Sequence, residues 1–199
     1  MIHPHTELRL VSPTIGLGVF ATKLIPRGTV TWVQDTLDIE LTADQFHALP
    51  EQQRVLVHHY SYLDSRGMYV LCWDSGRYMN HSCSPTTISY GTICDVALRD
   101  IQPGEEVTCD YVLLNLEHRL TCHCGTPTCR GEVAPGDFEK VGHLLDQAIQ
   151  DVTPFLARVE QPLVGMMLPP ERARLEAVMK GAAAPLCTEN RAPASPRRG

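Results

Sequence analysis

The sequence has no long hydrophobic run, no excess of basic residues and few aromatic residues. No apolar stretch approaches the roughly 20 residues needed to cross a bilayer, so we predict no membrane-spanning segment. The N-terminus lacks a positive cluster followed by an apolar stretch, and we expect no secretory signal. The net charge of −6 argues against a general nucleic-acid binder, because such proteins neutralise phosphates with Lys and Arg.

An acidic surface suits a basic partner instead, because complementary potentials speed the encounter of two molecules. With 199 residues, of which 43% are apolar, the chain can bury one sizeable core. Eight cysteines in a chain without a secretory signal are typical of metal ligands or buried thiols rather than of a disulfide framework. We therefore expect a reducing location, cytoplasmic or alternatively nuclear.

Short strands joined by tight turns dominate the first two thirds of the chain. Residues 8–11, 19–22 and 68–73 are apolar or alternating stretches bounded by turn residues, and 86–90 with 93–99 predict a hairpin that turns at Gly91-Thr92. Residues 21–28 and 97–104 are similar to each other: each has a strand, a basic residue, an Ile and a Pro/Gly turn. This echo favours a fold of short strands and turns rather than a repeat protein.

Helices are predicted at four places. Thr42 and Gln45 have the spacing of a capping box, and a second short helix is expected from 51 to about 58. Apolar residues recur at helical spacing from 138 to 152, with Asp137 as N-cap and Pro154 as the end, and a last helix is expected over 171–180. From residue 182 onward, Ala, Pro and Arg dominate, and we expect disorder.

The cysteine spacing predicts a metal site. Cys122, Cys124 and Cys129 supply three thiolates within eight residues, whereas structural zinc prefers four ligands in a tetrahedron. A fourth ligand must therefore come from elsewhere, and His123 is one candidate, although it sits between two ligands. The alternative is three buried thiols without a metal. The remaining cysteines are interpreted as structural or incidental: Cys72, Cys94 and Cys187.

Four blocks in order identify a family resemblance. They are Gly16-Leu17-Gly18, the segment Asn80-His81-Ser82-Cys83, the segment 104–111 that ends in Asp110-Tyr111, and the cysteine segment 122–131. Together they resemble the SET-domain protein methyltransferases that carry a cysteine-rich post-SET tail, over roughly residues 6–131. A lone Gly-x-Gly or a tyrosine after an aspartate would mean little, but the ordered set is specific.

The resemblance implies a mainly β SET fold of several small sheets with added helices and a pseudoknot, followed by a C-terminal helical extension. We divide the chain into a SET domain (1–116), a post-SET zinc tail (117–133), a helical extension (134–181) and a disordered tail (182–199). There is no pre-SET cysteine cluster.

The resemblance also implies roles for single residues. S-adenosylmethionine would be bound by Gly16, Leu17, Gly18, Asn80 and His81, zinc would be bound by Cys83 together with the three clustered cysteines, and Tyr111 would be the essential tyrosine. For His81 a buried imidazole without a cofactor contact is the alternative. Tyr60 would line the lysine channel. Cys109 departs from the family, which usually has Phe or Tyr there.

The implied function is methyl transfer from S-adenosylmethionine to the side-chain amine of lysine in a protein substrate, a histone or another basic protein. The alternative is a SET-fold, zinc-stabilised protein-binding module without catalysis. A zinc-ribbon nucleic-acid binder is disfavoured by the charge. We expect no direct nucleic-acid or membrane partner, and the oligomeric state is left open.

Overall fold

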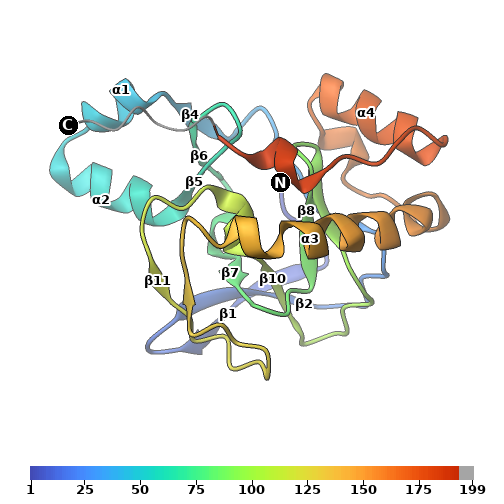
Figure 1. Ribbon diagram of the computed structural model, residues 1–199, viewed down its shortest axis with the longest axis horizontal. Coiled ribbons are helices and arrows are strands. Elements are labelled where there is room, and N and C mark those ends of the chain that lie inside the picture. Colours follow the sequence, from blue (N-terminus) through green and yellow to red (C-terminus); the bar gives the residue numbers. More distant parts are fainter. Residues whose placement is uncertain (193–199) are drawn as a thin grey trace.

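The computed structural model describes residues 1–192 as a strand-rich molecule with four small sheets. Helices α1 (Ala43–His47) and α2 (Glu51–Tyr60) lie at one end, and α3 (Phe138–Val152) and α4 (Pro169–Met179) lie at the other (Figure 1). This arrangement agrees with the SET fold and the C-terminal helical part that the sequence predicted. No helix among the described residues is long and apolar enough to cross a membrane.

The first sheet has the strand order β1-β2-β10-β7 and brings distant motifs together. Its strands are β1 (Thr6–Ser12), β2 (Gly16–Ala21), β10 (Glu106–Cys109) and β7 (Asn80–His81). β10 runs antiparallel to β2 and parallel to β7, with Thr108 opposite Asn80 and Cys109 opposite His81. The glycine, asparagine and tyrosine motifs therefore meet in one sheet.

The other three sheets are small and antiparallel. They contain β3 (Val30–Trp32), β9 (Cys94–Ala97) and β8 (Thr87–Tyr90); β4 (Ile39–Leu41), β6 (Tyr69–Leu71) and β5 (Ser61–Leu63); and β11 (Leu120–Thr121) with β12 (Glu132–Val133). The predicted hairpin at Gly91-Thr92 is confirmed as β8 and β9.

The helix boundaries follow local sequence chemistry. Thr42 caps α1 in a capping box with Gln45, as predicted. α3 ends at Val152, before Pro154, and short 3₁₀ turns complete the chain: η1 (Ser75–Tyr78), η2 (Tyr111–Leu114), η3 (Thr153–Arg158), η4 (Val164–Met166) and η5 (Cys187–Asn190).

The two echo segments pair with each other. Ile25 and Ile101 exchange both backbone hydrogen bonds, at 3.0 and 2.9 Å, and both side chains are fully buried. Gly28 and Gly104 close the two turns with φ of +88° and +86°, values that favour glycine. The similar sequences thus form two matching units in the centre of the molecule.

The C-terminal extension covers the domain and shares its core, since Ile149, Leu156 and Leu175 are fully buried in one cluster with strands β3, β8 and β9.

The predicted disorder from residue 182 is wrong for residues 182–192. Cys187 is fully buried and donates its backbone N–H to Asp146 Oδ1 at 2.7 Å. Asn115 donates to Asn190 O and accepts the backbone N–H of Ala192, so the segment is held by tertiary contacts that overall composition does not reveal. Residues 193–199 of the predicted tail lie outside the described residues, and the division into domains stays a prediction.

Candidate active site

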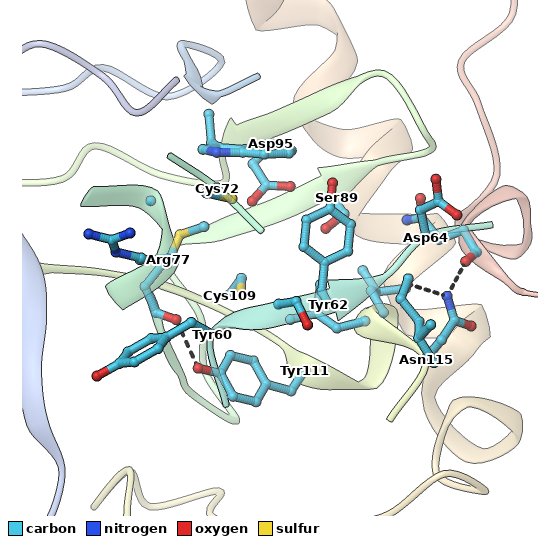
Figure 2. Close-up of a pocket in the computed structure, with 18 of the residues that line it drawn as sticks. Tyr60, Tyr62, Asp64, Cys72, Arg77, Ser89, Asp95, Cys109, Tyr111 and Asn115 are labelled. Carbon is cyan, nitrogen blue, oxygen red and sulfur yellow. Dashed lines mark hydrogen bonds between the residues drawn. The ribbon is translucent and has the colours of Figure 1, made fainter. Parts of the chain in front are cut away.

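A cavity of about 760 Å³ lies between the sheets. This is within the ordinary range for small-molecule sites, about 300–1,000 Å³. Figure 2 shows Tyr60, Cys109 and Tyr111 at this cavity together with residues from β5, β8 and β9. Ile15, Gly16, Leu17 and Asn80 also line it. The cavity therefore collects residues that are far apart in the sequence.

Asn80 connects the glycine motif to the neighbouring strand. Its amide nitrogen donates to Leu17 O at 3.0 Å and to Glu106 Oε1 at 2.7 Å. Both bonds use the nitrogen, so the amide oxygen can accept a bond from a ligand at the cavity. Gly16 has φ of +89° and open space around it, which exposes backbone at the cavity wall. Gly16, Leu17 and Asn80 thus offer polar groups that could bind the polar end of a ligand.

Gly18 lies where the side chains of neighbouring strands crowd together. It does not line the cavity; instead, a Cβ at this position would lie 2.4 Å from Glu106 Oε1 and 2.9 Å from Asn80 Nδ2. Only glycine leaves room for these two side chains. Gly18 therefore acts on the site through Asn80, and its predicted contact with a cofactor gains no support from its location.

The ring of His81 also faces away from the cavity. Its Nδ1 accepts the backbone N–H of Tyr111 at 3.2 Å, and its Nε2 lies 3.3 Å from Cys83 Sγ. Burial lowers the pKa of His81, and Arg130 lowers it further, against the opposing effect of Asp110. The neutral ring then carries its proton on Nε2, which points to the sulfur. Both ring nitrogens of His81 thus have partners within the protein, which favours the alternative of a buried imidazole without a cofactor contact. Only the backbone of His81 could still contact a cofactor.

Tyr111 follows β10 at the start of η2, with its ring at the cavity. Its hydroxyl donates to Met79 O at 2.8 Å (Figure 2), and burial raises the pKa of the phenol well above its usual value. The hydroxyl is therefore a neutral, oriented group. Such a group can position a reacting amine but cannot act as a phenolate base at neutral pH.

Tyr60 and Cys109, the two residues predicted for the lysine channel, both line the cavity. Tyr60 meets Tyr78 edge to face, with ring centroids 5.3 Å apart. Cys109 is 2% exposed and short, so the wall recedes at this point. The side chain of Tyr90 does not enter the part of the cavity beside Cys109. It is buried in the main core, where its hydroxyl bonds Thr153 Oγ1 at 2.6 Å.

The four predicted zinc ligands converge. The sulfur atoms of Cys83, Cys122, Cys124 and Cys129 all lie within 4.8 Å of one another, and those of Cys83 and Cys122 are 3.7 Å apart. Tetrahedral zinc with bonds of about 2.3 Å places its sulfur ligands about 3.8 Å apart. The geometry and the donor set therefore fit zinc. His123 is not part of the group.

Backbone donors stabilise negative sulfur at this cluster. Arg130 N–H points to Cys83 Sγ at 3.3 Å, and Gly131 N–H points to Cys129 Sγ at 3.4 Å. The Arg130 side chain also pairs with buried Asp110 at 2.7 Å. The cysteine tail is thus joined to the residue before Tyr111 as well as to Cys83.

The cavity also contains residues that the sequence did not indicate, among them Tyr62, Cys72, Ser89 and Asp95. Tyr62 is two residues after Tyr60 in the sequence, and burial raises the pKa of its phenol. A charged residue within the apolar strand 94–97 was the available signal for Asp95. Arg130 was missed as well, because its partner Asp110 becomes a neighbour only in the folded chain.

A family model described as the SET domain matches residues 16–112. The chain carries a SET domain. The chain is 30% identical over 146 residues to the histone-lysine N-methyltransferase Set2 of Drosophila melanogaster, covering 66% of this chain and 6% of that protein. It is 42% identical over 73 residues to the histone-lysine N-methyltransferase TRX1 of Oryza sativa subsp. japonica, covering 32% of this chain and 7% of the relative. The SET-domain chain thus spans only a small part of these relatives.

Proposed function

We propose that the protein transfers methyl groups from S-adenosylmethionine to lysine side chains of a basic protein. The convergence of Gly16, Asn80 and Tyr111 on one cavity carries the proposal, since these residues come from three separate blocks of the SET motif set. The relatives named as histone-lysine methyltransferases support the reaction class and the lysine acceptor. The net charge of −6 supports a basic substrate, a histone or a similar protein.

In this proposal the cofactor supplies an electrophilic methyl group. Gly16 and Leu17 offer backbone to it, and the free amide oxygen of Asn80 accepts a hydrogen bond from its charged amino-acid end. Tyr60 and Tyr111 enclose the lysine side chain, and the fixed hydroxyl of Tyr111 orients the amine. Much of the rate enhancement comes from alignment of the reacting atoms.

The zinc ion has a structural role. With Cys83 and the three clustered cysteines as ligands, it holds the segment 122–131 against the motif that contains Asn80. Because binding of structural zinc contributes directly to folding, the metal stabilises the wall of the active site. The thiolate ligands also require a reducing location.

Two measurements on the zinc-loaded chain test the proposal. Calorimetry with S-adenosylmethionine measures cofactor binding, and transfer of labelled methyl to core histones and to cell lysate measures catalysis. Tyr111→Phe is the matched control: it should bind cofactor and zinc normally but lose activity about a hundredfold, which corresponds to about 2.7 kcal/mol at the transition state.

The outcomes separate the two candidate functions. Binding of the cofactor with labelling that depends on Tyr111 supports the enzyme. Absence of cofactor binding in the zinc-loaded protein refutes it and leaves the protein-binding module. Activity of the Tyr111→Phe variant within about threefold of wild type would show that this tyrosine is not catalytic.

A further inference from the structure

Asp95 is a buried carboxylate in the wall of the active-site cavity. It lies in the middle of β9 and is only 6% exposed. In the sheet it is opposite Ser89 of β8 and Trp32 of β3. Figure 2 shows its carboxyl group on the β8–β9 side of the cavity, with Tyr111 on the opposite side.

No partner in the described part of the chain neutralises this carboxylate. It forms no ion pair with Lys, Arg or His, and its neighbour on β8 is the neutral Ser89. The positive group that acts on it is the N-terminal ammonium, which is already 3.1 Å from Asp35. Burial raises the pKa of Asp95 to about 6, against the opposing effect of Ser89. Cys94 and Val96, on either side of Asp95 in β9, pack in the hydrophobic core. The packing of β9 therefore does not require a charged residue at position 95.

Neither of the two cavity-lining arginines pairs with Asp95, because Arg66 pairs with Glu40 and Asp64 and Arg77 lies over the ring of Tyr78. Three further titratable groups of the cavity wall are neutral and cannot balance the carboxylate. Cys72, Cys109 and Tyr62 come from three neighbouring segments, and burial raises the pKa of each of them above its usual value. A buried carboxylate among neutral groups favours a cation or a proton as its partner. The cavity that it lines is the place from which such a partner can come.

The lysine amine of the proposed reaction is a cation of this kind. An amine that enters beside Tyr60 and Tyr111 approaches the wall at Cys109, where the side chain is short. Cys109 and Asp95 line the same cavity, and burial together with the Asp95 carboxylate raises the pKa of Cys109. The amine enters mainly protonated, because the ordinary pKa of lysine is about 10.4.

We propose that Asp95, in the wall of the active-site cavity, accepts the proton that the substrate ammonium must lose before methylation. This inference rests on the proposed function. One N–H bond of the ammonium breaks, its electron pair stays on nitrogen, and the proton passes through water in the cavity to form an O–H bond with the carboxylate. After methyl transfer the product is a methylammonium ion, and Asp95 returns its proton to solvent. Each transfer thus releases one proton, and a base with a pKa near the working pH suits the task.

Asp95→Asn tests the inference, because it keeps the size of the side chain and removes the base. We measure kcat/KM for methylation of core histones from pH 6 to pH 9.5 in the zinc-loaded protein. The variant should be at least about thirtyfold slower at pH 7 and recover toward wild type near pH 9.5, where more amine enters neutral. Asp44→Asn, which removes an exposed carboxylate in α1, should follow the wild-type profile.

A second measurement needs no protein substrate. n-Butylamine is titrated by calorimetry at pH 7 into the protein saturated with S-adenosylhomocysteine, and Asp95→Asn should bind this cation at least about tenfold more weakly. Equal amine affinity, or parallel pH profiles of the two proteins, overturns the role of Asp95 while the proposed function stands. A wild-type protein that neither binds S-adenosylmethionine nor labels any acceptor overturns both proposals.

Discussion

Replacement of Asp95 by Asn should make the protein more stable, although it should impair catalysis. The carboxylate has an ordinary pKa of 3.8, which burial raises to about 6 in the folded protein. The folded state thus holds the proton more tightly than the unfolded state. Stability from this group is fully present below about pH 4 and is lost as the pH rises through about 6. Above that pH the ionised carboxylate destabilises the fold.

The magnitude follows from the two pKa values. At 1.36 kcal/mol for each pH unit, the loss reaches about 3 kcal/mol at pH 7 and above. Asn cannot ionise and keeps a polar group for Ser89, so the variant should gain up to about that amount. For a chain of this size each kcal/mol moves the midpoint of thermal unfolding by about 2–4 °C.

The assay compares thermal and urea unfolding of wild type and Asp95→Asn at several pH values between 4.5 and 8. Zinc affinity also changes with pH, but the difference between the two proteins at each pH cancels that effect. The gain should be small at pH 4.5 and largest at pH 7 and above. A variant that is less stable at pH 8, or a difference that does not change with pH, would refute the reasoning and make Asp95 a paired structural residue.

Three further substitutions test other parts of the site. Wild type should hold about one zinc per chain and Cys83→Ser should lose it, so full zinc retention in elemental analysis would exclude the shared site. Wild type should form di- or trimethyllysine because Cys109 leaves room, and Cys109→Tyr should shift the product to monomethyl; only monomethyl product from wild type in mass spectrometry would contradict this. Gly18→Ala should displace Asn80 and weaken binding of S-adenosylmethionine at least about tenfold, and unchanged affinity in calorimetry would argue against that role.

The parts of the fold with local chemical causes were predictable from the sequence. The capping box at Thr42 and the turn at Gly91-Thr92 depend on a few neighbouring residues, and both are confirmed. The metal site was also indicated locally, because Cys122, Cys124 and Cys129 lie within eight residues of one another. The fourth thiol, Cys83, came from the family resemblance, and the structure brings it to the other three.

The remaining features depend on tertiary neighbours. The sequence predicted only a strand around Asp95, because only the packed sheets reveal that this carboxylate lines a cavity and forms no ion pair with a described basic side chain. Gly18 was predicted to contact the cofactor, and only the structure reveals that side chains from three other strands, those of Val11, Asn80 and Glu106, crowd its Cα. The order of residues 182–192 depends on Cys187 and its contacts with α3, which composition does not record.

The pairing of the two echo segments has a consequence for how the chain reaches its folded state. Ile25 and Ile101 are both central, yet most of the domain lies between them in the sequence. Contacts of this kind raise the relative contact order, and chains rich in them fold in milliseconds to seconds rather than in microseconds. Until that pairing forms, the strands on either side of it have exposed edges. The time before Ile25 meets Ile101 is therefore the interval in which refolding is most open to aggregation.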